Sequence, residues 1–299
     1  MTIDYLQDFF EIFNFSEESK ITLTENFLSI IKNPDAKLIF DNILYSYNEN
    51  MNCDFNAVIT QADEMARIAN IHPYTANALV VIALTKISKK YYQQFSIPEE
   101  VWQETMQDIK YKMVECKLIY DIWGTFVPSW YQGFFNLNIF AFGRLQFELI
   151  KFGHDYEYQG IKLSPTDYVL NVHIPRTGAR LEKEQVDSSY KQAIKFFSKV
   201  LQKEVAAFVC TSWLLAPQTI KLLKVDSNIY KFTADYNIIE SEDYLDYSQI
   251  WRLYDKNYNG NFDDLPKDTA LRKNYIEHFK KGGKFGYGYG VYLADIVEK

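Results

Sequence analysis

The sequence predicts an α+β or α/β chain in which a helical N-terminal part is followed by a mixed β-sheet flanked by helices. Two patterns lead to this fold class. Up to about residue 125, apolar residues recur every three or four positions, which is the period of an α-helix. From about residue 138 they recur at every second position, the period of a β-strand. We therefore expect two domains, a helical one over residues 1–130 and a sheet-containing one over residues 131–299.

Four amphipathic helices stand out in the first domain. Three are marked by apolar stripes, which are Tyr5, Phe9 and Phe13, then Leu23, Phe27 and Ile30, then Leu79, Ala83, Ile87 and Tyr91. The fourth follows Ser96-Ile97-Pro98-Glu99, which has the spacing of a capping box. In a capping box the Ser hydroxyl and the Glu carboxylate bind free N–H groups at the start of a helix. These stripes are most simply the core-facing surfaces of the helices.

Three consecutive strands are expected at the start of the second domain. The first runs through NIFAFGRLQFELI and places Arg144, Gln146 and Glu148 on one face. The second covers residues 156–163. The third covers residues 168–174, with Val169, Asn171 and His173 on one face. Because short turns join these strands, we expect an antiparallel meander.

The rest of the second domain alternates between helices and strands. We expect a helix over 187–201, an apolar strand over 205–211, a short helix after Pro217, a strand over 232–239, a helix over 247–254, a helix from Pro266 to Gly282, and a final strand over 285–291. The order of elements from residue 138 is thus β-β-β-α-β-α-β-α-β.

The composition excludes several classes of protein. Hydrophobic residues make up 47% and charged residues 24%, which is ordinary for a soluble globular chain. The net charge of −7 argues against a nucleic-acid binder. The longest apolar run, residues 78–84, is too short to span a membrane. No signal peptide and no disulfide framework are visible. We expect a cytoplasmic protein that acts on a small-molecule substrate, with a homodimer as one open alternative for its oligomeric state.

A candidate anion-binding loop follows the third strand. In VHIPRTGAR, the residues Arg176, Thr177, Gly178 and Arg180 stand between a strand and a helix. Guanidinium groups bind phosphate or carboxylate with two donors, and glycine lets the backbone approach an anion closely. The alternative is a turn whose arginines pair with Glu182 and Glu184.

His173 and Glu148 are the candidate general bases. A histidine has an intrinsic pKa near neutrality, so it can take a proton from an amine or a hydroxyl. The alternative for His173 is a half-buried ring that donates to a backbone carbonyl. The alternative for Glu148 is a structural ladder of polar side chains with Arg144 and Gln146.

Residues at the ends of the central strands could bind a substrate, because ligands meet parallel strands at their carboxyl ends. The candidates are Asn171, Ser212 and Trp213. Cys210 could act as a nucleophile with His173 as its base, although a small buried residue is the simpler interpretation.

We expect no metal. Residues 255–263 resemble a calcium loop, but its twelfth position, which should be a bidentate Glu, is Pro266. An Asn- and Gly-rich turn is therefore preferred. In GYGYG, residues 286–290, the glycines are interpreted as space for a helix that packs closely against a strand.

The element order of the second domain resembles the later part of a GNAT-type acyltransferase. The stretches RLQFEL, VHIPRTGAR, CTSWLLAP, SNIYKF, LPKDTALRK and GYGYGVY also resemble a bacterial family. That family pairs a helical N-acyltransferase N-terminal domain with a GNAT-like C-terminal domain. The resemblance implies an N-acyltransferase that moves an acyl group from acyl-CoA or acetyl-CoA, as the co-substrate, to an amine.

In the GNAT superfamily the loop after the third strand holds the pyrophosphate of acyl-CoA, so the resemblance implies this role for residues 175–180. The sequence departs from the superfamily pattern R/Q-x-x-G-x-G/A, because Gly178 follows Arg176 by two positions rather than three. Carboxylates at Glu182, Glu184 and Asp187 follow. Two alternatives therefore stay open, a catalytically inactive GNAT-like module that binds a ligand or partner, and a Cys210-dependent hydrolase or transferase.

Overall fold

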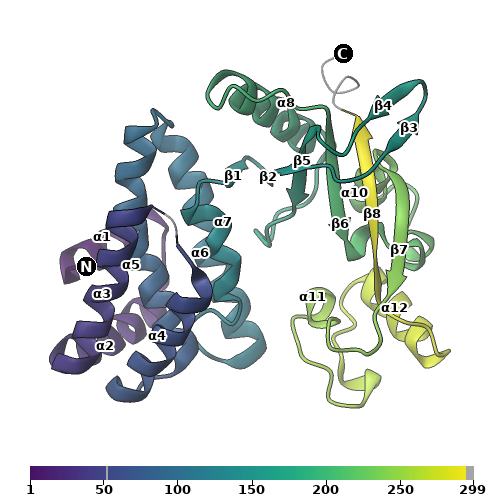
Figure 1. Cartoon of the computed structure of the whole chain (residues 1–299). Coiled ribbons are helices and arrows are strands. Elements are labelled where there is room, and N and C mark those ends of the chain that lie inside the picture. Colours follow the sequence, from purple (N-terminus) through teal and green to yellow (C-terminus); the bar gives the residue numbers. More distant parts are fainter. Residues whose placement is uncertain (52, 294–299) are drawn as a thin grey trace. The chain divides into compact units, whose positions relative to one another are not determined.

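The computed structural model describes residues 1–51 and 53–293 of the chain. Contacts divide the chain into two compact units, Met1–Phe140 and Ala141–Lys299 (Figure 1). Each unit buries a hydrophobic core of its own.

The first unit is a bundle built around one helix that is buried over most of its length. Its helices are α1 (Ile3–Ile12), α2 (Glu17–Lys32), α3 (Pro34–Asn50), α4 (Phe55–Ala69), α5 (Pro73–Gln94), α6 (Glu99–Tyr120), the 3-10 helix η1 (Pro128–Tyr131) and α7 (Gln132–Phe135). The central helix, α5, contacts α1, α2, α3, α4 and α6. Its apolar residues are therefore buried on nearly every side, from Ala76 to Ile87.

Side chains cap most helix starts in this unit, but the expected capping box at Ser96 is wrong. Ser96 has a left-handed conformation with φ 55°, and the N–H of Ile97 donates to the carbonyl of Tyr92. These features close α5, so Ser96 ends one helix rather than beginning the next. The next helix, α6, follows Pro98 with no side-chain cap.

Within residues 1–51 and 53–293, no single helix has the length and apolar composition to cross a membrane. The consecutive helices α4 and α5 meet those two criteria only when taken together, across a bend of 119°.

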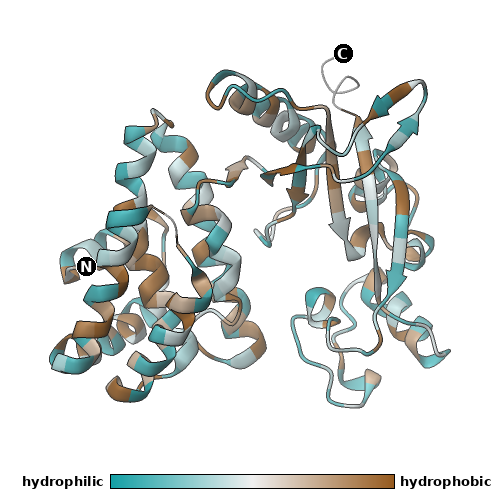
Figure 2. Cartoon of the chain, in the orientation of Figure 1, coloured by the Kyte–Doolittle hydropathy of each residue, from teal (hydrophilic) through white to brown (hydrophobic). Residues whose placement is uncertain are grey.

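The second unit is built on a six-stranded sheet. Its order is β1 (Ile139–Phe142), β2 (Leu145–Lys151), β5 (Tyr168–His173), β6 (Ala207–Ser212), β8 (Gly286–Leu293) and β7 (Asn237–Asp243). The pairs β2–β5, β6–β8 and β7–β8 are antiparallel, and β5–β6 is parallel. The outer strand β7 changes from hydrophobic at its start to hydrophilic at its end (Figure 2).

The expected three-strand meander is wrong. Residues 138–150 do not form one strand, because Gly143 has φ 58° and turns the chain between β1 and β2. Residues 156–163 form a separate hairpin of β3 (Tyr156–Tyr158) and β4 (Ile161–Leu163). As a result β2 pairs directly with β5, and Glu148 lies opposite Asn171.

The two faces of the sheet are covered differently. On one face, α8 (Lys183–Lys199) brings Tyr190 against Phe147, Phe208 and Tyr292. On the other face, the β3–β4 hairpin covers an apolar cluster of Phe152, Leu163, Val169, Ala207, Val209, Val291 and Leu293. Further along β2 and β5, this second face becomes polar.

The remaining elements complete the unit and shift several expected boundaries. They are η2 (Trp213–Leu215), α9 (Pro217–Leu222), α10 (Asn228–Ala234), α11 (Trp251–Tyr254), η3 (Phe262–Asp264) and α12 (Ala270–Lys280). The strand expected over 232–239 is thus part of a helix followed by β7. The helix expected from Pro266 begins instead at Ala270, where the Thr269 hydroxyl accepts the N–H of Arg272.

The interpretation of the glycines in β8 is confirmed. A Cβ on Gly288 would lie 2.2 Å from the backbone oxygen of Leu215, and one on Gly290 would lie 2.9 Å from the Cβ of Tyr236. The intervening Tyr287 and Tyr289 point to the opposite face, because side chains alternate along a strand. The glycines therefore allow η2 to pack directly on the sheet.

We predict that Gly288→Ala destabilises the second unit by about 1–3 kcal/mol, the usual cost of overpacking, because backbone at Leu215 cannot yield as a side chain can. Thermal unfolding followed by circular dichroism measures this as a lower midpoint. Ser241→Ala, on the strand position that faces Gly288, is the matched control and should leave the midpoint unchanged. Equal midpoints for both variants would contradict the packing argument.

Candidate functional site

The parallel strands β5 and β6 separate at their carboxyl ends. Their pairing covers three positions, Val169 with Ala207, Leu170 with Phe208, and Asn171 with Val209. Each strand continues beyond this point, since β5 stays paired with β2 as far as His173 and β6 stays paired with β8 as far as Ser212. We refer to the place where the β5–β6 pairing ends, between residues 172–173 and 210–212, as the gap.

A cluster of three polar side chains borders this gap. The Oε2 atom of Glu148 lies 3.1 Å from Nδ2 of Asn171 and 3.1 Å from Nε2 of His173. The two nitrogens lie 3.3 Å apart, as two donors that converge on one oxygen do. Because a carboxylate oxygen only accepts, the contact with Glu148 requires a proton on Nε2 of His173. The side chains of His173 and Glu148 are 23% and 26% exposed, so solvent reaches the cluster.

The cluster brings the two candidate bases into contact with each other. His173 is bound to a carboxylate rather than only to a backbone carbonyl. Glu148 binds His173 and Asn171 on the neighbouring strand, while three side-chain hydrogen bonds of Arg144 go to the loop after β5. The catalytic role of His173 and Glu148 stays a prediction.

Arg144 holds the loop that follows β5, and this residue was missed as a functional candidate. Its side chain donates to three carbonyl oxygens, those of Pro175 at 2.9 Å, Ala179 at 3.0 Å and Arg180 at 3.2 Å. Its backbone N–H donates to Oγ of Ser189 in α8, at 2.9 Å. The residue is only 9% exposed. A buried arginine therefore ties the loop to the sheet and to the helix that follows.

The four predicted anion ligands lie together in this loop but differ in their contacts. Arg176 forms an ion pair with Asp255, which also binds Arg272 at 2.6 Å. The alternative interpretation of the loop paired the arginines with Glu182 and Glu184, whereas Arg176 pairs with Asp255. The Oγ1 of Thr177 accepts the N–H of Ala179 at 3.1 Å.

Gly178 and Arg180 are exposed in the same loop. Gly178 has φ 80°, and nothing lies within 4 Å of the place where its Cβ would be, so the position requires glycine for its conformation and not for space. Binding of an anion by these residues stays a prediction.

Cys210 and His173 lie on opposite faces of the sheet. Cys210 pairs in register with Gly290, on the face that α8 covers, whereas His173 shares the opposite face with Asn171. Cys210 is 1% exposed, and burial raises its pKa to about 12. The thiol is therefore protonated at neutral pH and has no access to His173 as a base, which argues against covalent catalysis by Cys210.

Ser212 and Trp213 have structural contacts. The Ser212 Oγ accepts the N–H of Leu214, which caps η2, and the ring of Trp213 lies 5.4 Å from that of Phe285. Their use in substrate binding stays a prediction.

The loop over residues 255–263 uses its carboxylates in ion pairs. Asp255 binds Arg176 and Arg272, while Asp263 binds Lys267 and Lys280. In the part of the chain that the structure describes, no three His, Cys, Asp or Glu residues are grouped to hold a metal.

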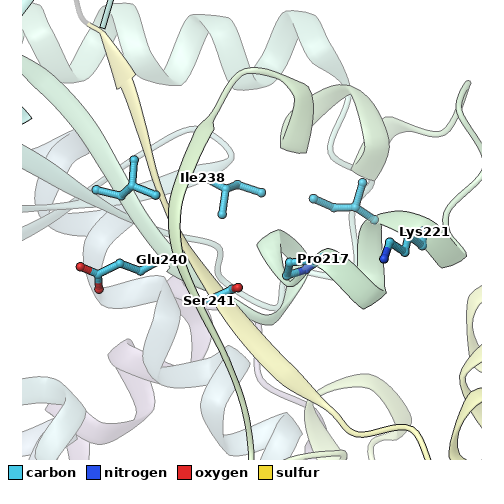
Figure 3. A pocket seen from close by; sticks show the side chains of 7 residues that line it. Pro217, Lys221, Ile238, Glu240 and Ser241 are labelled. Atoms are coloured by element: carbon cyan, nitrogen blue, oxygen red, sulfur yellow. The ribbon is translucent and has the colours of Figure 1, made fainter. Parts of the chain in front are cut away.

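A hollow of about 450 Å³ lies outside the gap, between α9 and the outer strand β7 (Figure 3). Apolar and charged side chains line it, namely Pro217, Ile220, Lys221, Ile238, Ile239, Glu240 and Ser241. None of these residues was a candidate from the sequence.

Comparisons with known proteins match both halves of the chain. The family model of the N-acyltransferase N-terminal domain matches residues 4–137, and that of the GNAT-like C-terminal domain matches residues 139–292. No curated protein sequence matches the chain.

Solved structures of acyltransferases share the fold. One, in complex with decanoyl-CoA and teicoplanin, is 19% identical with a TM-score of 0.76, over 96% of this chain and 87% of that one. A mutant acyltransferase in complex with octanoyl-CoA is 18% identical with a TM-score of 0.75, over 97% of this chain and 88% of that one. At these identities the likeness concerns the fold, and the expected fold class is confirmed.

We predict that all three cysteines resist modification in the folded protein. Burial raises the pKa of Cys53, Cys116 and Cys210 to about 12 each, so thiolate is scarce at pH 8. Titration with a disulfide reagent should find almost no reactive thiol in native protein and three in guanidinium. A native thiol that reacts as fast as free cysteine would contradict the buried assignment.

The raised pKa values of the three cysteines also make the stability of the fold depend on pH. The unfolded chain loses these thiol protons at about pH 8.5, whereas the folded chain keeps them to about pH 12. Since the folded state binds more protons in this window, its free energy of unfolding should fall as pH rises above about 8.5. Denaturant titrations from pH 7 to 10 would measure the decline.

Proposed function

Because the chain belongs to the family that joins an N-acyltransferase N-terminal domain to a GNAT-like C-terminal domain, we propose that it transfers an acyl group from a CoA thioester to an amine. The observation that carries this proposal is the gap between β5 and β6, bordered by the His173–Glu148 pair. Backbone groups of Val172 and of residues 210–212, which face this gap, can bind the amides of the pantetheine arm of CoA.

The loop over residues 175–182 is the proposed site of the CoA pyrophosphate. Three carbonyls of this loop accept hydrogen bonds from the buried side chain of Arg144, and helix α8 begins directly after the loop. Backbone N–H groups and a helix N-terminus favour an anion. The solved acyltransferases with decanoyl-CoA or octanoyl-CoA support a CoA ester as the donor, and the complex that also contains teicoplanin supports a small-molecule acceptor.

The chemistry needs one base. The acceptor amine must be neutral when its lone pair attacks the thioester carbonyl, and the tetrahedral intermediate then breaks the C–S bond and releases CoA. The His173 ring would take the amine proton, directly or through water, while Glu148 binds Nε2 and fixes the orientation of the ring. Glu148 would thus act by orienting His173.

An inactive binding module is the second candidate function. It is favoured by the ion pair of Arg176 with Asp255, which engages one expected phosphate ligand, and by the carboxylates of Glu182 and Glu184 next to the loop. Turnover distinguishes the two functions.

We predict that acyl-CoA stabilises the protein and is consumed by it. A ligand at about 100 times its Kd adds about 2.7 kcal/mol to the free energy of unfolding, which shifts the thermal midpoint upward by several degrees. The measurement is a thermal scan with CoA, acetyl-CoA, octanoyl-CoA and decanoyl-CoA, followed by assay of released CoA thiol with a panel of amines. A shift without release would favour the inactive module, and no shift at millimolar CoA would remove the donor site.

We predict that His173→Gln lowers kcat by about 10²–10⁴-fold, the usual contribution of a general base, and changes KM for acyl-CoA little. His154→Gln is the matched control, because His154 is exposed and lies outside the polar cluster. Its kcat should equal that of the wild type. Full activity of a folded His173→Gln protein would exclude His173 as the base.

A further inference from the structure

We propose that Arg144 is a positioning residue that shapes the loop over residues 175–182 into the binding site for the pyrophosphate of the acyl donor. This inference rests on the proposed function. It gives Arg144 a part in binding the acyl donor although Arg144 does not contact the donor.

Three side-chain hydrogen bonds of Arg144 end on one short loop. Its Nη1, Nη2 and Nε atoms each donate to a different carbonyl, and the three acceptors lie 31, 35 and 36 residues further along the chain. The guanidinium is planar and its donors have fixed directions, so these three bonds set the positions of the carbonyls relative to one another. A lysine ammonium could not span the same three acceptors.

The direction of the carbonyls determines the direction of the neighbouring N–H groups. In a planar trans peptide, the C=O of one residue and the N–H of the next point in opposite directions. Because the carbonyls of Pro175, Ala179 and Arg180 point at the guanidinium, the N–H groups of Arg176, Arg180 and Leu181 point away from it. These N–H groups make no hydrogen bond with any described part of the chain.

Two further features make the outward side of the loop suited to an anion. Gly178 is exposed at φ 80°, and apart from its chain neighbours nothing lies within 4 Å of the place where a Cβ would be, so the backbone can approach a ligand closely there. The buried positive charge of Arg144 lies behind the outward N–H groups and adds to their partial positive charge. The loop can therefore bind a phosphate through its backbone even though its sequence departs from the expected glycine spacing and Arg176 is engaged with Asp255.

The test compares two donors that carry the same acyl group. Octanoyl-CoA contains the pyrophosphate, whereas octanoyl-pantetheine lacks it. We expect Arg144→Lys to raise KM for octanoyl-CoA at least tenfold, with kcat within about threefold of the wild type. It should leave kcat/KM for octanoyl-pantetheine within about twofold. Arg252→Lys, an arginine on α11 in the same unit, is the matched control and should change neither donor.

The outcomes separate the possible explanations. An equal loss with both donors would overturn the proposal, because a residue needed only for folding or for chemistry affects both. An unchanged KM for octanoyl-CoA would also overturn it. If Arg144→Lys does not fold, Arg144→Gln keeps a planar donor group and takes its place in the same comparison. A wild-type protein that neither binds nor uses either donor would overturn the proposed function, and this inference with it.

Discussion

The short parallel pairing of β5 and β6 is the constraint on which the rest of the second unit depends. Three positions pair, and beyond them β5 stays bonded to β2 and β6 to β8. Each strand is thus held by its outer neighbour while the inner edges separate. A ligand with amide groups can hydrogen-bond to the backbone edges of Val172 and of residues 210–212, which face this gap. A pantetheine arm has that chemistry.

The elements next to the gap each contribute one part of a site. The β3–β4 hairpin covers the apolar half of one face and leaves the polar half, with Glu148, Asn171 and His173, beside the gap. On the opposite face, α8 buries Cys210 and supports the strands. The loop between β5 and α8 is fixed from the sheet side by Arg144 and from the side of α11 by Asp255. Donor binding and proton removal are thereby assigned to separate groups of residues.

The sequence predicted the parts of this arrangement that depend on local pattern. Apolar periodicity identified the helical half, the sheet half and most elements, and the alternating glycines of β8 predicted the close packing of η2. The prediction of strand pairing was wrong for residues 156–163, which were placed in the main sheet. An alternating pattern identifies a strand but does not say which strand is its neighbour. Arg144 was missed because its three acceptors lie more than thirty residues away. The ion pair of Arg176 with Asp255 was missed for the same reason, because these two residues are still further apart in the sequence.

The most direct test of this account is a crystal structure of the protein with bound octanoyl-CoA. The account predicts that the pantetheine arm lies between residues 172–173 of β5 and 210–212 of β6, with the thioester near His173 and the pyrophosphate on the N–H groups of the loop over residues 175–182. A ligand bound instead in the hollow between α9 and β7, or a pyrophosphate away from that loop, would contradict it.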